Sequence, residues 1–71
     1  MILDTAITNS DTNLTIRMEK NDATPKAGDL LTCGSEQMQV TQVTALTHNR
    51  FLVNVIRGVS PKSFFYGGKI K

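Results

Sequence analysis

Residues 26–58 read KAGDLLTCGSEQMQVTQVTALTHNRFLVNVIRG, and this stretch decides the fold. It contains three apolar or alternating runs, at 30–33, 36–43 and 50–57, and each is short enough for a strand. Gly34-Ser35 joins the first two runs, and glycine at the first position of a two-residue connection predicts a type II′ hairpin. A loop over residues 44–49 leads to the third run. The stretch therefore predicts three consecutive antiparallel strands.

The last of these runs, residues 50–57, is apolar on both faces. Phe51, Val53 and Val55 share one face, and Leu52 and Ile56 share the other. A strand of this kind is expected to be covered on both sides. In so small a domain, we expect one of the covers to be another subunit.

Outside this stretch the pattern also favours strands. Residues 2–7 and 14–19 are predicted strands, with turn-forming residues between them. Thr24-Pro25 excludes a helix across the following loop, and no segment has a helical period. We therefore predict one all-β domain over residues 1–71, a small antiparallel β-barrel or sandwich of about five or six strands, because closure removes exposed edges. Residues 59–71 are predicted to form an extended C-terminal arm.

The chain is small and has few groups suited to chemistry. A 71-residue chain buries only about 60% of the surface that it exposes when unfolded. Cys33 is the only cysteine and His48 the only histidine, so neither an intrachain disulfide nor a metal site is expected. No cofactor is predicted either. We expect the domain to reach its working stability in an assembly, as a homo-oligomer or in many copies.

The N-terminal sequence predicts neither a signal peptide nor a membrane span. Met1-Ile2-Leu3 is followed at once by Asp4, which interrupts the apolar run. We expect a soluble protein with no membrane partner, and the single thiol fits a reducing compartment.

Charge is unevenly distributed along the chain. Residues 1–36 hold all six acids and three bases, a net charge of −3, whereas residues 37–71 hold five bases and no acid. Three interpretations are open: the halves attract each other within one fold, they let one copy dock on the next, or the basic half binds nucleic acid.

The order of these segments resembles a small β module of bacteriophage tail, baseplate and neck proteins. The resemblance rests on a threonine-rich strand, an Ala-Gly entry to a hairpin, a Gly-x-Glu turn, a closing strand that ends in Arg-Gly, and a late glycine with a final apolar residue. These features correspond here to residues 12–16, Ala27-Gly28-Asp29-Leu30-Leu31, Gly34-Ser35-Glu36, 51–58, and Gly68 with Ile70.

The chain departs from that pattern after Arg-Gly. Ser60-Pro61-Lys62 stands where a Gly-Thr pair is often found, Phe65-Tyr66 stands near the place of a histidine, and an aromatic residue after Gly-x-Glu is missing. The resemblance implies a non-enzymatic structural protein of a virion, made in the host cytoplasm, that binds other virion proteins in a symmetric assembly. A capsid decoration protein is the alternative.

The candidate interface residues lie late in the chain. Consecutive aromatics in an extended segment cannot all face one core, so at least one ring of 64–66 should point outward and anchor a neighbour. The alternative is that the segment folds over its own barrel and covers all three rings. The predicted partner interface is Phe64, Phe65, Tyr66, Arg57 and Lys62, and the predicted structural turns are at Gly28, Gly34, Gly58 and Gly68.

The remaining polar candidates favour structural roles. Glu36 is expected to accept hydrogen bonds from backbone or from a base such as Arg57, His48 to be solvated, and Cys33 to be a buried, inert thiol. With acid, base and nucleophile candidates single and scattered, no catalytic residue and no small-molecule substrate are predicted. A small nucleic-acid-binding β-barrel is a further alternative, because the late bases lie near the three aromatics.

Overall fold

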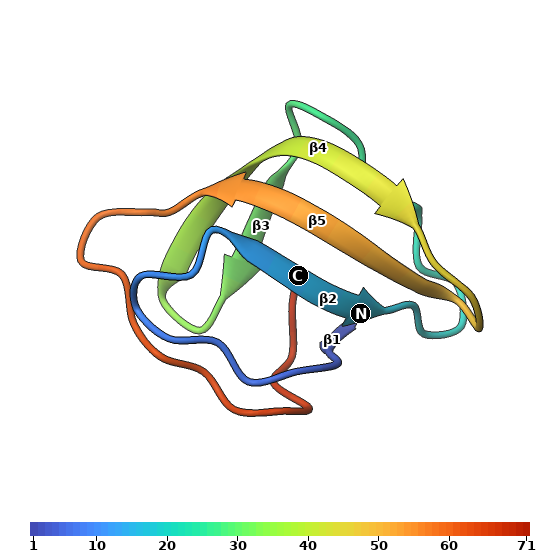
Figure 1. The fold of residues 1–71 in the computed structure, drawn as a ribbon, viewed down its shortest axis with the longest axis horizontal. Coiled ribbons are helices and arrows are strands. Elements are labelled where there is room, and N and C mark those ends of the chain that lie inside the picture. The colour runs from blue at the N-terminus through green and yellow to red at the C-terminus, as the bar shows by residue number, and fades with distance from the viewer.

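A five-stranded antiparallel sheet forms all of the regular structure (Figure 1). The structure is a computed structural model that describes residues 1–71 and contains no helix. The strands are β1 (Ile2–Leu3), β2 (Asn13–Arg17), β3 (Leu30–Cys33), β4 (Glu36–Ala45) and β5 (Arg50–Ile56). Their order across the sheet is β1-β2-β5-β4-β3. The sheet curls into a half-barrel, which confirms the all-β antiparallel prediction.

The hairpin between β3 and β4 has the predicted geometry. Cys33 pairs with Glu36 across the two-residue connection Gly34-Ser35. Gly34 has φ +60° and Ser35 does not have a positive φ, as a type II′ turn requires. A Cβ at Gly34 would also lie 3.1 Å from the Phe64 ring, so glycine is favoured here by contact as well as by conformation.

A β-bulge at Thr41 changes the side-chain pattern of β4. Val40 pairs with Val55 and Gln42 pairs with Asn54, which leaves Thr41 as the extra residue. Because of this insertion, Val43 packs against the core, although uninterrupted alternation would place it with Thr41 on the outer face. Strand β4 continues to Ala45 and is longer than the predicted run 36–43.

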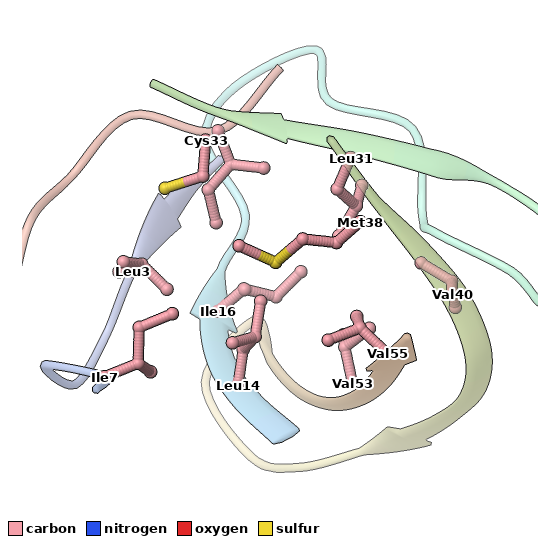
Figure 2. Close-up of a cluster of buried hydrophobic side chains, with 11 residues drawn as sticks. Leu3, Ile7, Leu14, Ile16, Leu31, Cys33, Met38, Val40, Val53 and Val55 are labelled. Atoms are coloured by element: carbon pink, nitrogen blue, oxygen red, sulfur yellow. The ribbon is translucent and has the colours of Figure 1, made fainter. Parts of the chain in front are cut away.

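The concave side of the sheet encloses the hydrophobic core, and Figure 2 shows its side chains pointing toward a common centre. Every strand contributes to it, together with Ile7 from the β1–β2 connection and Ile70 near the C-terminus. The eleven buried residues are Leu3, Ile7, Leu14, Ile16, Leu31, Cys33, Met38, Val40, Val53, Val55 and Ile70.

The C-terminal segment is hydrogen-bonded to both edge strands of the sheet. Ile70 donates its N–H to the carbonyl of Met1 at 2.9 Å, and Lys71 exchanges two backbone hydrogen bonds with Thr32. Ile2 also forms a bridge with Lys69. The expected extended arm is not confirmed, because this segment lies along its own domain.

The first predicted strand is shorter than expected. Regular pairing covers only Ile2 and Leu3, and Ile7 forms a separate bridge with Phe64, with backbone hydrogen bonds of 3.0 Å in both directions. The second predicted strand, 14–19, corresponds to β2 and ends earlier, at Arg17.

Candidate functional site

A buried ion pair between Glu36 and Arg57 organises one end of the half-barrel. The Arg57 Nε and Nη2 atoms donate to the two carboxylate oxygens of Glu36 at 2.8 and 3.0 Å. Nη1 donates to the carbonyls of Thr8 and Asp11, and Nη2 also donates to the carbonyl of Lys62, all at 2.7 Å. A guanidinium has five N–H groups, so every donor of Arg57 is used.

The Glu36 carboxylate is satisfied to the same degree. Besides Arg57, it accepts hydrogen bonds from the backbone N–H of Gly58 at 3.0 Å and of Lys62 at 3.1 Å. The hydrogen bonds from Arg57, then those from the two amides, lower the pKa of Glu36 to about 2 against the opposing effect of burial. The expectation that Glu36 accepts bonds from backbone or from Arg57 is therefore confirmed.

This network explains the Arg-Gly pair at the end of β5. A Cβ at Gly58 would lie 2.3 Å from the carbonyl oxygen of Gln37, so no larger residue fits without a backbone shift. The close approach brings the Gly58 amide to Glu36 at the start of β4. The network joins the β1–β2 connection, the β3–β4 hairpin and the segment after β5.

A groove of about 680 Å³ lies on the outer surface beside this network. Leu30 pairs with Gln39 and Gln39 pairs with Ile56, so these three residues form a row across β3, β4 and β5. Leu30 and Ile56 are 59% and 58% exposed, and Val59 is 94% exposed. We call Leu30, Ile56 and Val59 the outer apolar surface. No other part of this chain covers their side chains.

The aromatic cluster is divided between the inside and the outside. Phe64 is half-buried and packs against the core, whereas Phe65 and Tyr66 are 87% and 61% exposed. The Gly68 N–H donates to the Phe65 carbonyl at 3.1 Å, and Gly67 has φ +83°, which is the geometry of a type II turn. The turn therefore presents Phe65 and Tyr66, here called the aromatic turn, at its tip.

The two predicted basic interface residues differ in their availability. The Arg57 side chain is only 7% exposed, and all its donors are bonded within the chain. It therefore has no free group to offer a partner and acts by holding the residues of the groove in place. Lys62 is exposed, and its Nζ donates to the Ser35 hydroxyl at 3.0 Å beside the groove. The groove thus lies among the residues of the network, and the aromatic turn is a separate surface feature.

Of the four glycines predicted at turns, two have positive φ, Gly28 at +95° and Gly34 at +60°. Gly58 is required by the approach to Gln37 described above. Gly68 closes the aromatic turn as its fourth residue and accepts the Leu3 N–H at 2.9 Å.

Acids of the first half pair with bases of the second half within the fold. Besides the Glu36–Arg57 pair, Asp4 lies 3.3 Å from Arg50, and Glu19 lies 3.2 Å from Lys69. These pairs support the interpretation in which the two halves attract each other inside one domain. They also leave fewer free bases for nucleic acid than the sequence suggested.

The remaining candidates lie apart from these surfaces. His48 is exposed in the β4–β5 turn, where it and Asn49 both have φ 60°. Cys33 is 1% exposed, and burial followed by the charge of Glu36 raises the pKa of its thiol. No group of three or more His, Cys, Asp or Glu side chains that could hold a metal ion is present. The structure also contains no helix of the length and apolarity needed to cross a membrane.

Sequence reasoning missed most of the outer apolar surface. Ile56 was recognisable because residues 50–57 are apolar on both faces. Leu30 and Val59 were not, because only the strand register shows that Leu30 shares a row with Ile56. Comparison of this chain with models of protein families, with curated proteins and with solved structures finds no match.

Proposed function

We propose that this chain is a structural, non-enzymatic protein of a bacteriophage particle, a small tail, baseplate or neck component that binds neighbouring subunits in a symmetric assembly. The observation that carries the proposal is the outer apolar surface of Leu30, Ile56 and Val59. Exposed apolar side chains gathered on one face typically mark an interaction site. The resemblance to phage modules supplies the setting.

The working unit in this proposal is a closed barrel. The C-terminal residues Lys69–Lys71 bond to β1 on one side and to β3 on the other, which supports closure of the curled sheet. Closure protects both edges and fixes the aromatic turn in place. The role first assigned to an extended arm then falls to this turn, with Phe65 and Tyr66 as anchors for a neighbour.

The rigid network beneath the surface is suited to such binding. Arg57 and Glu36 lock three segments together, so the groove is formed before a partner arrives. A preformed site loses little conformational entropy on binding. The chemistry available at the groove, hydroxyl and amide groups around apolar side chains, suits recognition of a protein surface.

The decisive test is the location of the chain in purified phage parts. Tails and heads are separated from the phage whose genome encodes it, and both are examined by mass spectrometry. Presence in tails supports the proposal, presence only in heads indicates a decoration protein, and absence from both overturns the virion role.

A second test concerns the surface itself. Ile56→Ser with Val59→Ser should abolish incorporation into particles, whereas the exposed pair Thr5→Ala with Ala6→Ser should leave it unchanged. Circular dichroism of both double variants checks that the sheet remains folded. Normal incorporation of the folded Ile56/Val59 variant would show that the outer apolar surface is not the contact.

A further inference from the structure

Strand β4 has one open side over its second half. Its first residues, Glu36–Gln39, pair with β3. Beyond the bulge at Thr41, residues 42–45 pair with β5 on one side and with no strand on the other. This open side is called the β4 edge.

The backbone groups at the β4 edge can be assigned from the ladder. The Leu46 N–H donates to the Arg50 carbonyl at 2.9 Å, so Leu46 faces β5. Bonded residues alternate along an antiparallel strand, and Thr44 therefore also faces β5. Val43 and Ala45 direct their N–H and C=O groups to the open side. Neither takes part in any hydrogen bond outside the strand ladders.

The β4 edge lacks the charged residues and the proline that protect many free strands. Natural edges carry charged residues such as lysine, contain proline, or are bulged, short or covered. Residues 37–47 contain no charged residue and no proline, although one residue in five of the whole chain is charged. Gln42, Thr44 and Ala45 are all exposed.

We propose that the β4 edge pairs with the β4 edge of a second copy of this chain, antiparallel and about a two-fold axis. With Thr44 opposite Thr44 of the copy, Val43 lies opposite Ala45 of the copy, and four backbone hydrogen bonds form. The two-fold axis passes between the two copies of Thr44, so Thr44 is the only residue of this pairing that meets its own equivalent. An edge free of charge can do this without repulsion, and threonine pairs across strands are favourable.

This contact deepens the proposed function, because it names one neighbour in the assembly as a second copy. It uses a different part of the molecule from the outer apolar surface. Two copies would share one continuous sheet, and each would keep its groove and its aromatic turn free for other partners.

Sedimentation of the purified full chain over a range of concentrations tests the contact. We expect a monomer–dimer equilibrium, and Thr44→Lys should raise the dimer Kd by about tenfold or more, because two like charges then meet at the axis. Thr12→Lys, the same exchange at an exposed position away from the β4 edge, should leave the Kd unchanged.

Amide exchange identifies the surface within the dimer. The N–H groups of Val43 and Ala45 should exchange freely in dilute samples and become protected as the dimer forms. A chain that stays monomeric at millimolar concentration, or a dimer in which these two amides remain unprotected, overturns the proposal. Dimerisation is measured without phage particles, so its failure is distinct from failure of the virion role.

Discussion

Arg57 connects three segments of this fold that lie far apart in the sequence. Its guanidinium bonds to Glu36 and to three backbone carbonyls, and its side chain is almost fully buried. A charge in such a place is tolerated only when it is paired and all its hydrogen bonds are made. The pair therefore has a structural role, and Glu36 has no free lone pair for acid–base chemistry.

Removal of one partner of this pair should be far more costly than removal of an exposed one. Arg57→Met leaves the Glu36 carboxylate buried without its partner, and we expect a loss of about 3–5 kcal/mol in the free energy of unfolding. Arg50→Met breaks the more exposed pair with Asp4 and should cost about 1 kcal/mol or less. Urea unfolding of both variants measures the difference. Equal losses of unfolding free energy in the two variants would show that the buried pair stabilises the fold no more than the exposed one.

The same carboxylate predicts how stability depends on pH. The pKa of Glu36 is about 2 in the folded chain and 4.5 ordinarily, so the folded state favours the ionised form. Its contribution is complete above pH 4.5 and disappears as the pH falls through 2, a change of about 3 kcal/mol. Urea midpoints between pH 6 and pH 2 should fall more steeply for the natural chain than for Glu36→Gln. If the urea midpoints of the two proteins fall in parallel with pH, the ionisation of Glu36 is not the cause of the acid sensitivity.

At the scale of elements, local patterns in the sequence predicted most of the sheet. The apolar run 30–33 became β3 with the same limits, and Gly34-Ser35 gave the hairpin, because strand alternation and turn chemistry are local. The bulge at Thr41 was not predictable, since it depends on how β4 and β5 fit together. The pairing of Ile70 and Lys71 with distant strands was missed for the same reason.

The C-terminal segment can be tested as an element of the core. Ile70 is 4% exposed, and Ile70→Ala should lower the free energy of unfolding by about 2–5 kcal/mol through lost burial and a cavity. Lys71→Ala, at an exposed neighbour, should change it by less than about 0.5 kcal/mol. Thermal unfolding followed by circular dichroism compares them. An unaffected Ile70→Ala variant would indicate that residues 69–71 are a free arm after all.

For the whole molecule, the sequence predicted that apolar and aromatic side chains are available for an interface, but not which of them lie on the same surface. It predicted that residues 50–57, apolar on both faces, are covered on both sides. In this chain Ile56 is 58% exposed, so the cover by another subunit stays a prediction. The sequence also directed attention to three aromatics and two bases in one interface. The fold separates them: Phe64 and Arg57 turn inward, whereas Phe65 and Tyr66 point out. Such a division is set by tertiary contacts, which residue type alone does not specify.

The rate at which the single thiol, Cys33, is labelled measures how readily the folded molecule opens. Cys33 is 1% exposed and its strand forms a bridge with Ile70, so a reagent can reach the sulfur only after the C-terminal segment and β3 separate. If this opening is global and costs about 5 kcal/mol, labelling of the native chain by a disulfide reagent should be at least about a thousandfold slower than in urea. Ile70→Ala should accelerate native labelling by the factor that matches its loss of stability. Native labelling within tenfold of the rate in urea would show instead that the C-terminal segment detaches alone, and the closed barrel would not be the working unit.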